Sequence, residues 1–306
     1  YTGGTTGGIK AAILSHRNIL ANAIQVREWL GKQLRFGEDI AICALPLYHI
    51  FALTCNSIVF FYFGSNNILI TNPRDIKGFV KELKKYQFTF ISGVNTLFNK
   101  LLEEPKFSSC DFSKLNISIA GGMPVQKSVG DRWQKVTGCL LVVGYGLSET
   151  APAASIDPIN GKAFSDTIGL PLPSTEMSIQ NKKGEILSAG EVGEICIRGP
   201  QVMRGYWKKE SETKKVLTQD GWFRTGDVGI MQENGFFKIV DRIKDMIIIS
   251  GFNVFPSEIE EVAMLNEKVL EAGCIGVINS EGQEEVKLFV SIKDGHDISK
   301  DEIIEH

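Results

Sequence analysis

The sequence is poor in the residues that build metal clusters and disulfide frameworks. Only 4 of its 306 residues are histidine, and its 6 cysteines are scattered without a C-x-x-C pair. This pattern indicates neither a zinc site nor a disulfide-stapled secreted domain, and it is typical of a reduced, cytoplasmic protein. The cysteines are Cys43, Cys55, Cys110, Cys139, Cys196 and Cys274.

Long runs of one charge and long apolar runs are also missing. The 33 basic and 36 acidic residues give a net charge of −3 without a basic stripe, which argues against a nucleic-acid partner. The longest apolar run, residues 50–63, is interrupted by Thr54, Asn56 and Ser57 and falls short of the ~20 residues that span a bilayer. It therefore predicts a buried helix. Any membrane contact is expected to be peripheral, at the inner face of the cell membrane.

The overall composition is that of an ordinary globular protein, with 43% hydrophobic and 23% charged residues. Two domains are a fair expectation for 306 residues. No signal peptide opens the sequence. It starts on Tyr1 without an initiator methionine and ends inside an unfinished helical pattern, residues 299–306, so we expect a piece of a longer protein.

Strand and helix patterns alternate through residue 160. Ser15 is expected to cap a first helix. This alternation predicts an α/β fold, a parallel sheet with helices on both faces. The expected strands are 40–45, 67–71, 88–92, 115–120 and 140–143, and the expected helices between them are 50–63, 75–86, 94–103 and 125–137.

The pattern changes after residue 160. Residues 161–243 read as short strands joined by turns, which predicts an antiparallel β subdomain and, with residues 1–160, one large domain. A charged break around Lys244 then leads into a small, incomplete α+β domain, residues 244–306. In this part Ser257 is expected to cap a helix, with Glu260 completing a capping box.

The first ten residues, YTGGTTGGIK, combine four glycines, three threonines and a lysine. Successive glycine N–H groups can form an anion-binding nest, threonine hydroxyls add donors, and Lys10 adds a full charge. The spacing is not that of a P-loop, because Ile9 stands where the lysine is required. A flexible linker is the alternative, which the lysine and the capped helix directly after it disfavour.

A second glycine-bearing motif, residues 144–150 (GYGLSET), follows a predicted strand. Its glycines allow close backbone approach and are expected to leave the faces of the Tyr145 ring open for stacking. Ser148 and Thr150 offer hydroxyl donors, and Glu149 is an oxygen ligand suited to Mg²⁺. The motif Ala120-Gly121-Gly122 ends another strand. In parallel sheets, ligands bind beyond such carboxyl ends.

A third candidate, Asp227, lies in GWFRTGD, residues 221–227. Placed just after a glycine turn, its carboxylate could accept hydrogen bonds from a ribose diol. An Asx-turn role is equally plausible on the residues alone.

Taken in order, six motifs resemble the ANL adenylating superfamily, most closely the bacterial long-chain fatty acid–CoA ligases. They are YTGGTTGGIK, PLYHIF, AGGMP, GYGLSET, GWFRTGD and DRIKDMIIISGFNVFPSEIEE. The resemblance implies a reaction in two steps: ATP activates a fatty acid to acyl-AMP, and coenzyme A then takes the acyl group. It implies fatty acid, ATP, Mg²⁺ and CoA as ligands and is compatible with a homodimer.

The resemblance also assigns residues to the ATP site. Thr2 and Glu149 would place Mg²⁺, and Asp227 would hold the ribose hydroxyls with Arg242 beside it. Ser148 or Thr150 would contact the α-phosphate. Gly121, Gly122, Gly144, Tyr145 and Gly146 would frame the adenine. The loop that wraps the β- and γ-phosphates would comprise Tyr1, Thr2, Gly3, Gly4, Thr5, Thr6, Gly7 and Lys10.

Further assignments concern the acyl and CoA sites. Lys244 would be the hinge about which the small domain turns between half-reactions, after which Gly251, Phe252 and Asn253 would line the pantetheine channel. His49 would lie near the acyl and CoA tunnels, with a packed core histidine as the alternative. Val94, Leu97 and Phe98 would form the acyl wall, with generic core as the alternative.

One departure from the superfamily bears on activity. The adenylation lysine of these enzymes lies in a P-x-x-x-x-G-K motif, which does not occur before His306. Within the fold, a fatty acyl-AMP ligase and a medium-chain or aryl acid–CoA ligase are rival readings. As it stands, the chain could also be a nucleotide-binding module without turnover, or a structural fragment left unstable by exposed sheet edges.

Overall fold

A computed structural model describes residues 1–3, 8–249, 252–279 and 284–306. The chain divides into two compact units. Unit 1 comprises residues 1–178, 196–224 and 232–238; unit 2 comprises 179–195, 225–231 and 239–306. These units divide the chain differently from the boundary near Lys244, which stays a prediction.

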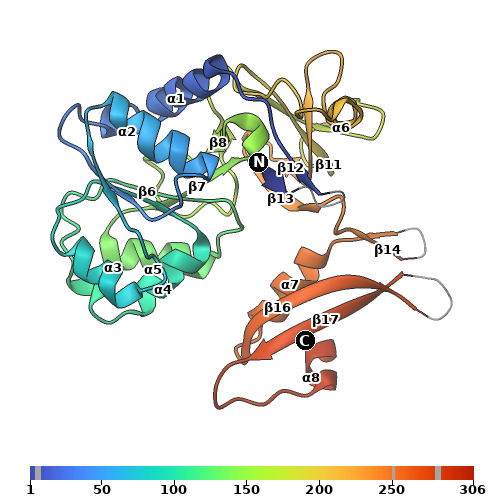
Figure 1. The fold of residues 1–306 in the computed structure, drawn as a ribbon. Helices are drawn as coiled ribbons and strands as arrows, with labels where there is room; N and C mark the ends of the chain where they lie inside the picture. Colours follow the sequence, from blue (N-terminus) through green and yellow to red (C-terminus); the bar gives the residue numbers. More distant parts are fainter. Residues whose placement is uncertain (4–7, 250–251, 280–283) are drawn as a thin grey trace. The chain divides into compact units, whose positions relative to one another are not determined.

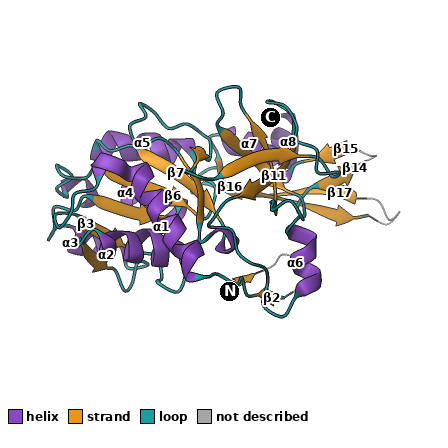
Figure 2. Ribbon diagram, turned by 90° about the horizontal axis from the view of Figure 1, so that it is seen from above, coloured by secondary structure: helices purple, strands orange, loops and turns teal. Residues whose placement is uncertain are grey.

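Among the described residues of unit 1, seven strands form one sheet in the order β4-β3-β5-β6-β7-β8-β9. Figure 1 labels β6, β7 and β8 of this sheet, and Figure 2 labels β3, β6 and β7. The strands from β4 to β7 are parallel, and β8 and β9 add an antiparallel edge. The predicted parallel sheet is confirmed. The strands are β3 Ile40–Cys43, β4 Asn66–Leu69, β5 Phe90–Gly93, β6 Ile117–Gly121, β7 Leu141–Gly146, β8 Ala153–Ile156 and β9 Leu170–Pro171.

Helices cover both faces of this sheet, as the alternation predicts (Figure 1). One core packs α1 and α2 against side chains such as Phe90 and Ile119, and a second core packs α3, α4 and α5 against Ile42 and Ile91. Neighbouring residues Phe90 and Ile91 enter opposite cores because side chains alternate along a strand. The helices of unit 1 are α1 His16–Leu30, α2 Val59–Tyr62, α3 Ile76–Leu83, α4 Asn95–Glu103, α5 Lys127–Thr137 and α6 Glu210–Val216, with short 3₁₀ turns at Gly31–Gln33, Phe107–Ser109 and Ser148–Thr150.

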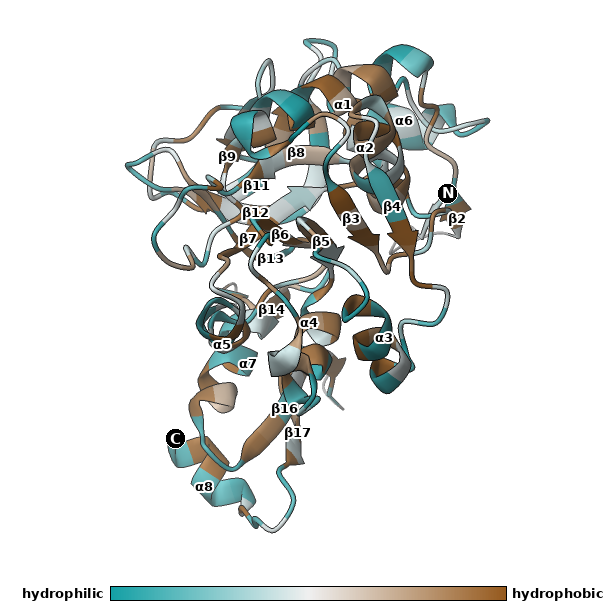
Figure 3. Cartoon of the chain, turned by 90° about the vertical axis from the view of Figure 1, so that its left-hand side faces the viewer, coloured by the Kyte–Doolittle hydropathy of each residue, from teal (hydrophilic) through white to brown (hydrophobic). Residues whose placement is uncertain are grey.

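Local chemistry explains these helices. Ser15 caps α1 as predicted, because its hydroxyl accepts from the backbone N–H of Asn18 at 3.2 Å while the Asn18 side chain accepts from Ser15. Helix α3 carries hydrophobic residues beside hydrophilic ones, and its apolar side, including Phe79 and Leu83, is buried (Figure 3).

The apolar run 50–63 forms a π-helical stretch, Ala52–Ile58, continued by α2. The predicted helix is confirmed, but it is buried on one side only: Ala52 and Phe60 are buried, whereas Phe61 is 85% exposed. In the described part of the chain, no helix is long and apolar enough to cross a membrane.

A four-stranded sheet follows, in the order β10-β11-β12-β13. The prediction of strands here is confirmed. Asp227 lies inside β12, which begins at Phe223, and it directly follows Gly226, whose φ is +78°. The strands are β10 Glu176–Gln180, β11 Gly193–Arg198, β12 Phe223–Met231 and β13 Phe237–Arg242.

The described residues in the last part of unit 2 form two antiparallel strand pairs, β14–β15 and β16–β17, and two helices. Helix α7 lies against β16 (Figure 1). The predicted capping role of Ser257 is wrong: the N-cap is Phe255, and Ser257 instead hydrogen-bonds the carbonyl of Val240 and the carboxylate of Asp241. The elements are β14 Ile247–Ile249, β15 Phe252–Val254, α7 Pro256–Leu265, β16 Val269–Ile278, β17 Glu284–Ile292 and α8 Lys300–Glu305.

Candidate active site

The turn after β7 is held by the hydroxyl of Thr150. This hydroxyl accepts a hydrogen bond from the backbone N–H of Leu147 at 2.9 Å and lies within donating distance of the carbonyls of Leu147 and Pro152. Thr150 is completely buried, whereas Ser148 is half-buried. Of the two hydroxyls predicted as phosphate ligands, only that of Ser148 remains available.

The glycines of this region serve close backbone packing. A Cβ on Gly146 would lie 1.9 Å from the carbonyl oxygen of Pro152, and one on Gly121 would lie 2.8 Å from the carbonyl oxygen of Gly144. Contacts this short exclude any side chain at either position. Gly144 itself has ordinary surroundings, and Gly122 has a positive φ of +78°.

Tyr145 is more buried than the sequence predicted. The residue is only 9% exposed, and β8 pairs with this end of β7 with Ser155 opposite Tyr145. Its role in framing the adenine, with Gly121, Gly122 and Gly144, stays a prediction.

Glu149 is a buried carboxylate with an identified donor. The residue is 5% exposed, and its Oε1 accepts a hydrogen bond of 2.7 Å from the hydroxyl of Tyr206. Its backbone carbonyl accepts from the N–H of Met203 at 2.8 Å. A buried carboxylate needs such partners, since its desolvation is otherwise costly.

The segment 203–207, which contains Tyr206, connects Glu149 to the residues that follow Lys10. Arg204 N–H donates to the carbonyl of Ile13 at 3.0 Å, Ile13 N–H donates to Gly205 at 2.8 Å, and Trp207 N–H donates to Ala11 at 2.8 Å. The segment thus lies antiparallel to residues 11–13 while its first residue holds Glu149.

Lys10 lies on a short hairpin of β1 Thr2–Gly3 and β2 Ile9–Lys10, directly opposite Thr2. Its Nζ is 2.8 Å from Oε2 of Glu212 on α6 and 5.0 Å from the centre of the Tyr206 ring. Figure 2 shows β2 beside α6. The structure therefore brings Lys10 and Glu149 to Tyr206, and it places Thr2 opposite Lys10 on the paired strand, all within one unit.

The charges of this group shift two pKa values. Hydrogen bonds from Lys10 and then from Lys215 lower the pKa of Glu212 to about 2. Burial, followed by the hydrogen bond to Glu149, raises the pKa of Tyr206 well above its ordinary value. Near neutral pH, Glu212 is therefore an anion and Tyr206 a neutral hydrogen-bond donor.

The donor chemistry around Glu149 suits Mg²⁺ bound together with a nucleotide. The described residues contain no group of three or more His, Cys, Asp or Glu side chains that could hold a metal alone. Mg²⁺ commonly binds through one or two protein oxygens and completes its shell with phosphates and water. The carboxylate of Glu149 and the hydroxyl of Thr2 fit that mode.

A second group of predicted residues lies in unit 2. The Arg242 Nε is 3.1 Å from Oδ1 of Asp227, whose side chain is 6% exposed. Lys244 is exposed and pairs only loosely with its neighbour Asp245, at 3.4 Å. Phe252 and Asn253 are exposed on β15.

Five predicted site residues lie outside the part of the chain that the structure describes. They are Gly4, Thr5, Thr6, Gly7 and Gly251.

The predicted acyl wall is largely core. Phe98 is fully buried, and its ring meets Trp133 edge to face with centroids 4.7 Å apart. Leu97 belongs to the same core, because α4 turns this side toward α5 and the sheet. Only Val94 is half-buried, and it lies next to Gly122. The packing corrects the assignment of Phe98 and Leu97 as wall residues.

His49 is exposed, so the alternative of a packed core histidine is not supported. Its Nδ1 accepts a hydrogen bond from the N–H of Phe51 at 3.2 Å. Phe51 reaches Gly121, where a Cβ would lie 3.2 Å from its ring. The segment 49–51 therefore places an exposed imidazole two residues from a ring that packs against the glycine-bearing strand ends.

Sequence reasoning missed Tyr206, Glu212 and Phe51. The run Arg204-Gly205-Tyr206-Trp207 contains a pattern that could have pointed to Tyr206, an aromatic pair directly after a glycine. The structure gives that glycine a φ of +140°. Glu212 carries no signal, because it is one of several charges on a short polar helix.

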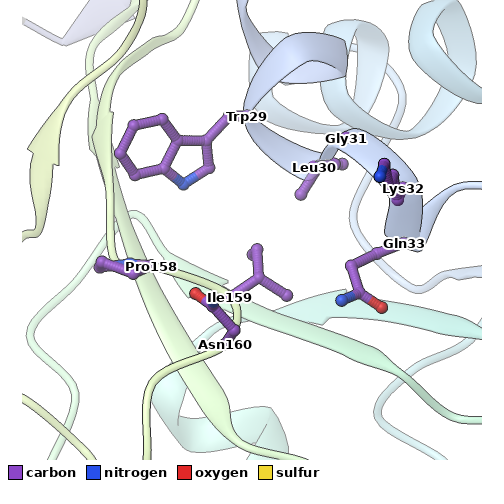
Figure 4. A pocket seen from close by; sticks show the side chains of 8 residues that line it. All are labelled: Trp29, Leu30, Gly31, Lys32, Gln33, Pro158, Ile159 and Asn160. Carbon is purple, nitrogen blue, oxygen red and sulfur yellow. The ribbon is translucent and has the colours of Figure 1, made fainter.

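A separate cavity of about 320 Å³ lies between the end of α1 and residues 158–160 (Figure 4). Trp29, Gln33 and Ile159 are among its lining residues, and none of the predicted site residues lines it. It is therefore distinct from the group around Tyr206.

Comparison with known proteins decides the family. A family model described as AMP-binding enzyme matches residues 1–207. The chain belongs to the AMP-binding enzymes.

Its relatives include proteins named long-chain-fatty-acid–CoA ligase. One from Salmonella typhimurium is 52% identical over 294 residues, which cover 96% of this chain and 52% of that protein. One from Yersinia pestis is 51% identical over 306 residues, covering 100% of this chain and 54% of the relative. This AMP-binding enzyme thus spans about half the length of the curated relatives it matches.

Solved structures of AMP-binding enzymes have the same fold. ATP-bound MatB from Rhodopseudomonas palustris matches with a TM-score of 0.92 at 30% identity, over 100% of this chain and 59% of that one. An O-succinylbenzoate coenzyme A synthetase from Bacillus subtilis in complex with AMP matches with a TM-score of 0.87 at 27% identity, over 100% and 60%.

Proposed function

We propose that this chain is the nucleotide-binding part of a long-chain fatty acid–CoA ligase. The observation that carries the proposal is the contact of Lys10 and Glu149 with Tyr206, in a chain about half identical to ligases of that name. Fatty acid, ATP and CoA are the proposed substrates. A cytoplasmic location with peripheral membrane contact is part of the same proposal.

The reaction requires alignment more than an enzyme nucleophile. A fatty carboxylate oxygen attacks the α-phosphorus of ATP, forming a new P–O bond and breaking the bond to pyrophosphate. The CoA thiolate then attacks the acyl carbonyl, and the C–O bond to AMP breaks. Because both partners of the first step are anions, fixed cationic and hydrogen-bonding groups supply the main rate enhancement.

Residues of unit 1 would serve the phosphates. Lys10 would place its ammonium against the β- and γ-phosphates, and Ser148 would donate to the α-phosphate. Thr2 and Glu149 would hold Mg²⁺, which when bound neutralises phosphate charge. Thr150 would act indirectly, by fixing the turn that carries Ser148 and Glu149.

Residues of unit 2 would serve the ribose and CoA. The Asp227 carboxylate, oriented by Arg242 at 3.1 Å, is a suitable acceptor for the ribose diol. Exposed Phe252 and Asn253 would contact the pantetheine, and exposed His49 in unit 1 would face the acyl and CoA tunnels.

Lys244 is proposed as the hinge of the small domain, and replacing it tests this. Lys244→Pro fixes one backbone dihedral in an exposed turn. In a protein that carries this chain within the full length of its relatives, we expect acyl-AMP formation within about twofold of wild type and thioester formation reduced at least about tenfold. Single-turnover assays of the two half-reactions measure both. Equal loss of both steps would argue against a hinge, and Lys182→Pro, in an exposed turn outside the proposed hinge, controls for general damage.

Identification of the products separates the rival ligases. The full-length protein is incubated with ATP·Mg²⁺ and palmitate, with and without CoA, and the products are identified by mass spectrometry. We expect palmitoyl-CoA whenever CoA is present. Accumulation of palmitoyl-AMP regardless of CoA would favour a fatty acyl-AMP ligase, and preference for an eight-carbon or aryl acid would favour the medium-chain or aryl alternative.

The 306-residue chain alone is proposed to bind nucleotide without turnover, since the P-x-x-x-x-G-K lysine is not among its residues. Calorimetry with ATP·Mg²⁺ tests binding, and a pyrophosphate assay with palmitate tests turnover. Pyrophosphate release by this chain at the rate of its full-length relatives would refute a binding-only role.

A further inference from the structure

We propose that Tyr206 is a positioning residue that fixes two parts of the ATP site at once. Its hydroxyl orients the Glu149 carboxylate and its ring supports the Lys10 ammonium. The inference rests on the proposed function, because it takes Glu149 as the metal-binding carboxylate and Lys10 as the phosphate-binding lysine.

The hydroxyl contact constrains Glu149. The Tyr206 hydroxyl donates to Oε1 at 2.7 Å, and both residues are nearly buried. Oε1 of Glu149 is therefore engaged in a hydrogen bond within the protein. A carboxylate has a second oxygen, with which it can bind a cation. A fixed carboxylate loses less conformational entropy on binding the metal, so removal of an orienting partner commonly weakens metal affinity 10- to 100-fold.

The ring contact constrains Lys10. The ammonium lies 5.0 Å from the ring centre, within the range of a cation–π interaction. Glu212 holds the same ammonium from another direction at 2.8 Å, and the Lys10 side chain is only 11% exposed. Lysine side chains are flexible, so these two contacts define where the charge stands before a phosphate arrives.

Tyr206 itself is firmly placed. Its N–H donates to the hydroxyl of Thr213 at 2.8 Å, and its neighbours hydrogen-bond to residues 11–13 and to Glu149. The preceding Gly205 has a φ of +140° and lies so close to Thr213 that a Cβ would be 2.7 Å from its methyl group. These contacts hold the backbone in one conformation, which directs the Tyr206 ring between Lys10 and Glu149.

Two substitutions separate the hydroxyl from the ring. Tyr206→Phe removes only the donor to Glu149, whereas Tyr206→Leu also removes the aromatic face under Lys10. Binding is measured in two ways: Mn²⁺ by electron paramagnetic resonance in the presence of a non-hydrolysable ATP analogue, and the analogue alone, in a chelator, by calorimetry.

We expect Tyr206→Phe to weaken Mn²⁺ binding about tenfold and to leave metal-free analogue binding within about twofold. We expect Tyr206→Leu to weaken Mn²⁺ binding similarly and, in addition, metal-free analogue binding about threefold. A buried tyrosine with a purely structural role would lower both affinities in parallel in Tyr206→Phe, and that result would overturn the inference.

The chain offers a matched control. Tyr86, just after helix α3, donates to Glu82 of that helix at 3.3 Å, a tyrosine–glutamate hydrogen bond outside the site. Tyr86→Phe is expected to leave both affinities unchanged. An effect equal to that of Tyr206→Phe would contradict the inference.

Glu149→Gln distinguishes failure of the inference from failure of the proposed function. If Glu149→Gln leaves Mn²⁺ binding unchanged, Glu149 is not the metal ligand and the proposed function loses its basis. If Glu149→Gln weakens Mn²⁺ binding and Tyr206→Phe does not, only the inference fails.

A second measurement keeps the Tyr206 hydroxyl and so does not depend on the folding of Tyr206→Phe or Tyr206→Leu. Fluorotyrosine at position 206 keeps the hydroxyl and provides a ¹⁹F resonance. We expect this resonance to shift when Mg²⁺ and the analogue bind, and the metal-dependent part of the shift to disappear with Glu149→Gln. A resonance unaffected by Mg²⁺ would overturn the inference.

Discussion

Glu149→Gln is expected to abolish most acyl-adenylate formation, lowering its rate by a factor on the order of 100 to 1,000. The substitution removes the negative charge that would hold Mg²⁺ but keeps an amide oxygen that can accept from Tyr206 at the same place. The fold should therefore persist. The negative charge of the phosphates would no longer be neutralised by a bound Mg²⁺. Palmitate-dependent pyrophosphate release, in a protein of the relatives' full length, measures the effect.

The control for Glu149→Gln is Glu82→Gln. Glu82 also accepts a tyrosine hydroxyl, from Tyr86, but on a surface helix. It should leave the rate unchanged. Adenylation at the wild-type rate in Glu149→Gln would refute the assignment of this carboxylate.

Gly146→Ala is expected to destabilise unit 1 by about 3 kcal/mol. The new methyl group would stand 1.9 Å from the carbonyl oxygen of Pro152, which is backbone and cannot rotate away as a flexible side chain would. The turn that carries Ser148 and Glu149 begins at the next residue, so nucleotide affinity should fall together with stability. Urea unfolding measures the free energy, and calorimetry measures the affinity.

Gly273→Ala is the matched control. Gly273 lies in β16, and a Cβ there would meet no heavy atom within 4 Å. Its effect should stay within about 1 kcal/mol. A Gly146→Ala variant as stable as Gly273→Ala would show that β7 and β8 do not approach each other as described.

The architecture was predictable because burial pattern and fold agree along residues 40–143. Runs such as Ile40–Cys43 and Ile117–Gly121 are mostly apolar and almost fully buried, as parallel strands between two helical layers require. Ser15 was predictable as a cap because capping depends on neighbours three residues away. The length of β12 was not predictable, since its glycines resemble a turn in the sequence. They belong to a strand because β12 pairs with β11 and β13.

The sequence motifs of the candidate site could be found from the sequence, but the structural roles of their individual residues could not. Thr150 and Ser148 look equivalent in sequence, and only the burial of Thr150 under Pro152 separates them. Phe98 looks like a tunnel wall until Trp133 is found against it. Tyr206 could not have been paired with Glu149, because 57 residues separate them and no periodic pattern relates them.

The activity proposed for these residues is the activation of a long-chain fatty acid with ATP. Its most direct test is pyrophosphate release by a protein carrying this chain within the full length of its relatives, measured with ATP·Mg²⁺ and each of a series of acids. We predict release only when an acid is present, with half-maximal rate at lower concentration for palmitate than for octanoate. Release that is independent of acid, or that is no better with palmitate than with acetate, would contradict the claim.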